Sequence, residues 1–131
     1  MIEQNKTSIL VVEDEVLIST ALTDELKDTG FKVLTAENGE QGLKIALNDK
    51  PHLILLDILM PVMNGITMME KLRESGEWGK KVPIILLTNL SPNEDKIITA
   101  ISKDAPVYYF IKSDWKLSDI AEKIKEVLAH K

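Results

Sequence analysis

Side chains that can do chemistry follow directly on four short apolar runs of this sequence. They are Glu13 and Asp14, Asp57, Thr88 and Lys112, which follow the runs at 9–12, 53–56, 84–87 and 107–111. Three carboxylates, one hydroxyl and one ammonium suit phosphate chemistry, because a carboxylate can attack phosphorus and the other two groups can bind phosphoryl oxygens. We therefore ask whether a fold would gather these five side chains in one place.

The three carboxylates, Glu13, Asp14 and Asp57, limit what such a site can hold. At about 5 Å and an effective dielectric constant of about 20, each pair of like charges repels by about 3 kcal/mol. The group therefore needs a cation or a proton, and hard oxygen ligands select Mg²⁺, Mn²⁺ or Ca²⁺. Mg²⁺ is favoured when a phosphate shares the site, because this ion keeps bound water and bridges phosphoryl oxygens.

Each of these residues also has a structural interpretation when it is taken alone. Glu13 and Asp14 could simply favour the N-terminus of a following helix. Thr88 suits a turn at a strand end, and Lys112 could be a lysine whose aliphatic stem lies on the core. Asp57, at the end of a fully apolar run, is the candidate nucleophile that would form an acyl phosphate.

Five apolar runs of strand length would position these side chains. They lie at Ser8–Val12, Lys32–Ala36, Leu53–Leu56, Ile84–Leu87 and Val107–Ile111. The first, third and fourth contain four successive apolar residues each, which is typical of parallel strands covered on both faces. The second run is more mixed and fits the edge of a sheet. Because ligands bind at the carboxyl ends of parallel strands, the five reactive side chains should meet at one edge.

Apolar residues at helical spacing separate the predicted strands. The helices are expected around 18–26 with a stop at Gly30, at 42–47, at 66–72 with a stop near Gly76, from a capping box that opens at Ser91, and at 117–128. We expect the segment Gly76–Lys81 to be a loop. Five strands alternating with five helices predict an α/β fold with a doubly wound parallel sheet.

Composition narrows the class of protein further. The chain has 131 residues, a formal net charge of −5 and no cysteine. This length suits a single domain, and the negative charge disfavours nucleic-acid binding as the main activity. The absence of cysteine excludes disulfides, thiolate metal sites and cysteine nucleophiles. No apolar run approaches the ~18 residues of a membrane span, and the N-terminus does not resemble a signal peptide, so we expect a cytoplasmic protein.

Four motifs resemble the receiver domain of two-component response regulators, of the single-domain kind seen in chemotaxis. They are Ile9–Glu15, Leu55–Gly65, Val82–Thr88 and Tyr109–Lys112. The stretch from Asp57 to Gly65 is the most specific of them. The resemblance covers nearly the whole chain and implies one receiver domain over 1–131, with its core at about 8–128. It also implies a flavodoxin-like sheet with strand order 2-1-3-4-5.

The resemblance implies a role for each residue of the site. Asp57 would accept a phosphoryl group; Asp14, Asp57 and the backbone carbonyl of Leu59 would bind Mg²⁺, for which Mn²⁺ could substitute. Glu13 would act mostly through water, while Lys112 and Thr88 would bind phosphoryl oxygens. Tyr109 would follow the movement of Thr88 between two rotamers. This movement would change the face formed by the helix from Ser91, the strand at 107–111 and the last helix.

The implied partners are a histidine kinase or phosphotransfer protein as phosphodonor and a downstream protein target. We expect no direct nucleic-acid binding and no membrane insertion, from the charge and the short apolar runs, and a monomer or a phosphorylation-dependent dimer. The chain would phosphorylate and dephosphorylate itself but would turn over no separate substrate. One alternative is an interaction domain that works without phosphorylation. An aspartyl-nucleophile phosphatase is less favoured, because such enzymes usually place an acid two residues after the nucleophile, where this chain has Leu59.

Overall fold

The fold is an α/β sandwich built on a five-stranded parallel sheet in the order β2-β1-β3-β4-β5. The computed structural model describes residues 7–88, 107–111 and 116–129. Its strands are β1 (Ser8–Val12), β2 (Lys32–Ala36), β3 (Leu53–Asp57), β4 (Ile84–Thr88) and β5 (Val107–Ile111). The predicted fold class and strand order are thus confirmed. Strands β3 and β4 each extend one residue beyond the apolar run, to Asp57 and Thr88.

The apolar runs form strands because both faces of the sheet are covered. Every residue of β3 is buried, whereas β2, at the edge of the sheet, alternates between exposed, partly buried and buried positions. Successive side chains of a strand point to opposite faces. Leu10 and Val12 of β1 accordingly belong to one core cluster, and Ile9 and Val11 belong to the other.

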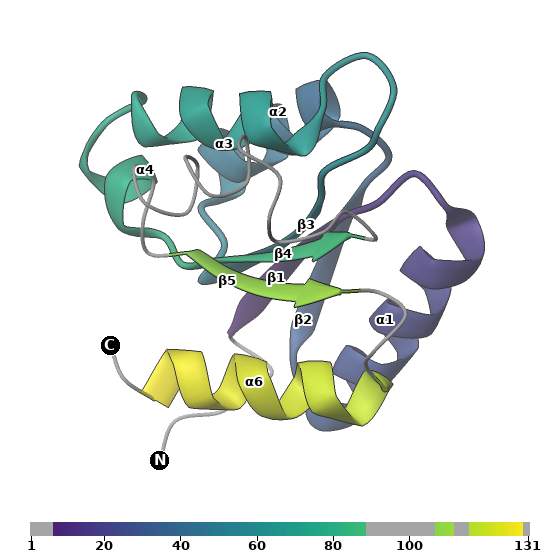
Figure 1. Ribbon diagram of the computed structural model, residues 1–131. Coiled ribbons are helices and arrows are strands. Elements are labelled where there is room, and N and C mark those ends of the chain that lie inside the picture. Colours follow the sequence, from purple (N-terminus) through teal and green to yellow (C-terminus); the bar gives the residue numbers. More distant parts are fainter. Residues whose placement is uncertain (1–6, 89–106, 112–115, 130–131) are drawn as a thin grey trace.

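Helices cover the sheet on both faces (Figure 1). On one face lie α2 (Gly39–Asp49), α3 (Gly65–Arg73) and the short α4 (Glu77–Lys81); on the other lie α1 (Val16–Thr29) and α6 (Leu117–Ala129). Helix α6 contributes Ile120, Ile124 and Val127 to the second core, in agreement with the apolar stripe predicted for it. In the part of the chain that the structure describes, no helix is both long and apolar enough to cross a membrane.

Local capping sets the helix ends. Gly30 ends α1 with a positive φ of 107°, a conformation in which a Cβ is costly, as the sequence predicted. Helix α2 begins at Gly39, earlier than expected, because the Asn38 side chain caps it by accepting a hydrogen bond from the backbone N–H of Gln41. The helix predicted from Ser91 falls outside the described residues.

The prediction that Gly76–Lys81 forms a loop is wrong, because Glu77–Lys81 forms the helix α4. Arg73, which is 8% exposed at the end of α3, holds this helix in place. Its Nη1 atom donates to the carbonyl oxygens of Gly79 at 2.9 Å and Val82 at 2.7 Å. Five residues are too few to form a stable helix alone. This buried side chain therefore accounts for a helix that the local sequence does not predict.

Replacing Arg73 with alanine should lower the free energy of unfolding by about 2–4 kcal/mol, because two buried carbonyls lose a charged donor. Urea denaturation followed by circular dichroism measures the effect. Lys71→Ala, on the exposed side of the same helix, is the matched control and should change stability by less than about 0.5 kcal/mol. Equal stability of the two variants would show that Arg73 does not hold α4.

Candidate functional site

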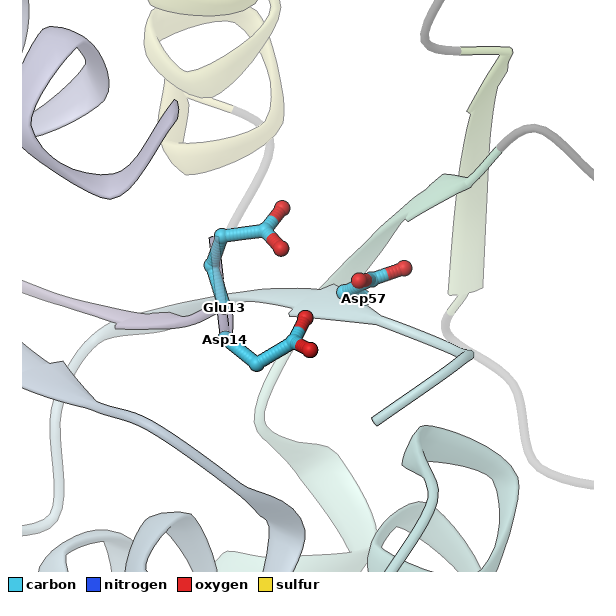
Figure 2. A group of neighbouring side chains, drawn as sticks. All are labelled: Glu13, Asp14 and Asp57. Carbon is cyan, nitrogen blue, oxygen red and sulfur yellow. The ribbon is translucent and has the colours of Figure 1, made fainter. Parts of the chain in front are cut away.

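Sheet register brings the acidic residues of β1 and β3 together. Val12 pairs with Leu56, so the residues that follow, Glu13 and Asp57, end two adjacent strands at the same level. Each of Glu13, Asp14 and Asp57 offers a carboxylate oxygen, and these oxygens all lie within 4.8 Å of one another. Figure 2 shows the three side chains directed into a common space at the carboxyl edge of the sheet. The structure therefore confirms that these three carboxylates converge.

The three carboxylates differ in their exposure to solvent. Glu13 is 3% exposed and Asp57 is 4% exposed, whereas Asp14 is exposed. Glu13 Oε2 accepts a hydrogen bond of 3.2 Å from the backbone N–H of Glu15, the N-cap residue of α1. The capping interpretation thus accounts for one oxygen of Glu13, but it gives no reason for a second carboxylate, Asp57, to be buried beside it.

The segment 58–64, between β3 and α3, forms the other wall of the site. A pocket of 390 Å³ lies between Asp14 on one side and Leu59, Met60, Pro61 and Asn64 on the other. The segment is closed at its base, where the Gly65 N–H donates to the Ile58 carbonyl at 2.9 Å. Leu59, whose backbone carbonyl is a predicted metal ligand, therefore lines the same pocket as Asp14, and this residue is 60% exposed.

A tight turn shapes the tip of this segment. Val62 has a φ of +69°, and the Met63 N–H donates to the Pro61 carbonyl at 2.7 Å across it. A β-branched residue in this region carries strain of about 1–3 kcal/mol. Asn64 then caps α3 by accepting a hydrogen bond from the Thr67 N–H at 2.9 Å. The surrounding contacts must therefore outweigh the strain at Val62.

Gly65 has a role at the site that the sequence alone does not reveal. A Cβ at this position would collide with the backbone oxygen of Asp57 and would lie 3.0 Å from the Cα of Ile58. Only glycine allows the start of α3 to approach the end of β3 so closely. The Asn64–Gly65 dipeptide, a common turn signal, was the available clue.

The remaining predicted residues lie on or after the two last strands. Thr88 ends β4 and pairs in register with Ile111, while Asp57 pairs with Leu87, one residue before Thr88. Tyr109 lies in β5 and pairs with Leu86. Lys112 lies outside the described residues. The backbone thus places Thr88 at the same sheet edge as Asp57.

The donor set fits a small, hard divalent cation. Two ligands on opposite sides of Mg²⁺, each at about 2.1 Å, are separated by about 4.2 Å, which is close to the observed upper limit for the three carboxylate oxygens. All of these donors are oxygens, as Mg²⁺ and Mn²⁺ prefer. Ionised Glu13 and Asp57 at this separation repel by about 3 kcal/mol, and a cation would remove that repulsion.

Comparison with known proteins gives one consistent family. The profile described as the response regulator receiver domain matches residues 9–125. A probable transcriptional regulator, ycf27, of Cyanophora paradoxa is 39% identical over 95 residues, which are 72% of this chain and 38% of that protein. A protein-glutamate methylesterase/protein-glutamine glutaminase of Archaeoglobus fulgidus is 32% identical over 121 residues, 92% of this chain and 34% of that protein. The chain thus spans little more than a third of these relatives.

A solved structure shows the same architecture. The signal receiver domain of a signal transduction histidine kinase from Syntrophus aciditrophicus superposes with a TM-score of 0.80 at 27% identity. The match covers 95% of this chain and 91% of that one. Domains similar to this chain therefore occur in a histidine kinase, in a probable transcriptional regulator and in a methylesterase/glutaminase.

Replacing Asp14 with asparagine should raise the melting temperature in EDTA by about 2–4 °C, because one of three converging charges is removed. The same substitution should reduce the further rise that Mg²⁺ produces in the unaltered chain, because a ligand is lost. Differential scanning calorimetry with and without Mg²⁺ measures both effects. Asp49→Asn, an exposed residue at the end of α2, is the control and should keep the full response to Mg²⁺. A full Mg²⁺ response in the Asp14 variant would contradict the assignment.

Proposed function

Because the chain belongs to the response regulator receiver domain family of two-component systems, we propose that it is a signalling module switched by phosphorylation of Asp57. The phosphodonor would be a phosphohistidine on a histidine kinase or a phosphotransfer protein. The observation that carries this proposal is the burial of Asp57 at the end of β3, with oxygens of Glu13 and Asp14 within 4.8 Å. Three carboxylates this close together repel one another, and a divalent cation among them would remove that repulsion.

Mg²⁺ is the cofactor that this donor set favours, with Mn²⁺ as a substitute. Asp14, Asp57 and the backbone carbonyl of Leu59 would hold the ion, and Glu13 would act mostly through bound water. When bound, the ion supplies positive charge that neutralises the carboxylates and the phosphoryl oxygens. Asp14 and Leu59, two of the proposed ligands, line the same 390 Å³ pocket, which supports placing the ion there.

The proposed reaction moves one phosphoryl group. A carboxylate oxygen of Asp57 attacks phosphorus, the new O–P bond forms, and the P–N bond of the phosphohistidine breaks. The electron pair of that bond returns to the imidazole nitrogen of the donor, which then takes up a proton. Lys112 and Thr88 would bind the phosphoryl oxygens that the ion does not, because an ammonium and a hydroxyl are both donors to phosphate. Later attack by water on phosphorus would restore the carboxylate and release phosphate.

Phosphorylation would fill the space beside Asp57 and would change the balance of charge there. The signal to a target protein would follow from these two changes. Thr88, once bonded to a phosphoryl oxygen, would shift, and Tyr109 would change rotamer with it. Their strands are adjacent, since Leu86 pairs with Tyr109 and Thr88 pairs with Ile111. The face formed by the segment from Ser91, β5 and α6 would then present a different surface to its protein target. This is a local change of charge that biases a two-state element.

Four exposed apolar side chains lie on the two segments that follow the acidic residues, and they support a protein phosphodonor. Val16 and Leu17, at the start of α1, are 70% and 86% exposed, and Leu59 and Val62, in the segment after β3, are 60% and 75% exposed. A small-molecule donor has no use for such residues. A helical phosphohistidine protein would bury them as it brings its histidine to Asp57, and exposed apolar clusters of this kind mark interaction sites.

Incubation with Mg²⁺ and acetyl phosphate should add one phosphoryl group to the chain, detected by intact-protein mass spectrometry. Asp57→Asn should abolish the addition while the chain keeps its circular dichroism spectrum, because the amide is of the same size but is not a nucleophile. Asp49→Asn, the exposed control, should be phosphorylated normally. An unmodified wild-type chain under these conditions would favour the interaction domain that works without phosphorylation.

Lys112→Met should slow phosphorylation by acetyl phosphate about 10²-fold or more, because a preorganised cation at the phosphoryl oxygens is lost. Quenched samples taken over time and analysed by mass spectrometry give the rate. Lys116→Met, four residues away and exposed, is the matched control. The proposed role of Lys112 would be lost if the two variants reacted at the same rate.

A further inference from the structure

The segment 58–64 carries the proposed Leu59 ligand, but its internal hydrogen bonds do not fix it relative to β1. The Gly65 N–H closes the base of the segment on Ile58, and the Met63 N–H shapes its tip by bonding to Pro61. These bonds tie the segment to itself and to the end of β3. The metal site takes ligands from both β1 and β3, so its geometry needs a contact that joins this segment to the β1 side.

Gly39, the first residue of α2, makes such a contact. Its backbone N–H donates to the carbonyl oxygen of Met63 at 2.9 Å. The first N–H groups of a helix have no partner within the helix, so this bond also satisfies a donor of α2. Helix α2 in turn rests on β1, because a Cβ at Gly42 would lie 3.0 Å from both Cγ atoms of Val12. Val12 directly precedes Glu13, so the chain of contacts ends beside the acidic residues.

Lack of space requires a glycine at position 39. A Cβ there would collide with the carbonyl oxygen of Met63 and would lie 2.9 Å from its carbonyl carbon and 3.0 Å from its Cβ. Two of these three atoms belong to the backbone and cannot rotate away. Any side chain at position 39 must therefore push Met63, and with it the strained turn at Val62, away from α2.

We propose that Gly39 is a positioning residue for the metal site, because its contact with Met63 holds the segment 58–64, and with it Leu59, beside the pocket that Leu59 shares with Asp14. Gly39 touches neither metal nor phosphate and acts through Met63. Met63 lies between Pro61 and Asn64, which line the 390 Å³ pocket together with Asp14 and Leu59, so a displacement of Met63 would move that wall of the pocket. The inference rests on the proposed function, since it assumes that the metal binds there.

The test compares Mg²⁺ affinity in three folded variants of the whole chain by titration calorimetry. Gly39→Ala should weaken Mg²⁺ binding roughly 10-fold, as is usual when the support of a metal ligand is lost. Gly79→Ala is the first control, because its Cβ would collide with the Leu72 carbonyl at the junction of α3 and α4, away from the site. Asn38→Ala is the second, because it removes the cap of α2 without adding an atom at position 39.

Both controls should lose stability and keep the wild-type Mg²⁺ affinity. Unchanged affinity in a folded Gly39→Ala variant overturns the role of Gly39 and leaves the metal site intact. An equal loss of affinity in all three variants also overturns it, because general loosening would then be the cause. Absence of Mg²⁺ binding in the wild-type chain overturns the proposed metal site and this inference with it.

A measurement on the wild-type chain covers the case in which Gly39→Ala does not fold. The amide resonances of Gly39 and Met63 should shift during a Mg²⁺ titration, with the same dissociation constant as those of Asp14 and Leu59. Resonances of Gly39 and Met63 that stay fixed while Asp14 responds would overturn the proposal.

Discussion

Repulsion between carboxylates at the carboxyl edge of the sheet is the constraint on which the rest of this structure depends. Glu13 and Asp57 are both almost fully buried, and Asp14 lies beside them. Burial of one leucine or isoleucine contributes about 1.5–3 kcal/mol, which is similar to the repulsion of about 3 kcal/mol between the buried pair. The two cores on either side of β1 and β3 are large enough to hold the carboxylates together. A cation that enters such a site removes the repulsion between the carboxylates, whereas an anionic phosphoryl group adds to it unless a cation is also bound.

The same edge depends on close backbone approaches as well as on charge. Gly65 lets α3 begin directly against Asp57, and Gly39 lets α2 touch the carbonyl of Met63. Two helices from different βα units thus meet at the segment that follows β3. The exposed valine with positive φ in that segment, Val62, remains in its strained conformation because both ends of the segment are held. Close backbone approaches at two glycines therefore fix where the segment that lines the pocket lies.

The sequence was sufficient for the sheet and for the acidic part of the site. The bounds of the predicted apolar runs agree with those of every observed strand to within one residue. The agreement is close because a parallel strand that is covered on both faces must be apolar at nearly every position. The convergence of Glu13, Asp14 and Asp57 then follows from the rule that parallel strands end at one edge. The start of α2 at Gly39 was missed, because no apolar residue marks its first turn.

Other features depend on contacts between distant residues and could not be predicted. Helix α4 is stabilised by Arg73, which donates to the carbonyls of Gly79 and Val82. The sequence of α4 itself does not predict a helix. The contact between Gly39 and Met63 joins residues that are far apart in the sequence. A glycine that is needed for space looks the same in a sequence as one that is needed for a turn, so the roles of Gly39 and Gly65 required the structure.

The strand order has a consequence for biosynthesis. Strand β1 lies between β2 and β3 in the sheet. Its hydrogen bonds to β3 cannot form until the segment that begins with Leu53, about 40 residues after the end of β1, has been synthesised. At ribosomal speeds of about 5–20 residues per second, this wait lasts roughly 2–8 s. During that time the run of four apolar residues in β1 has only β2 and the helices α1 and α2 as possible neighbours. The nascent chain is therefore most prone to mispairing before β3 emerges, which makes this interval the one in which a chaperone would be of most use.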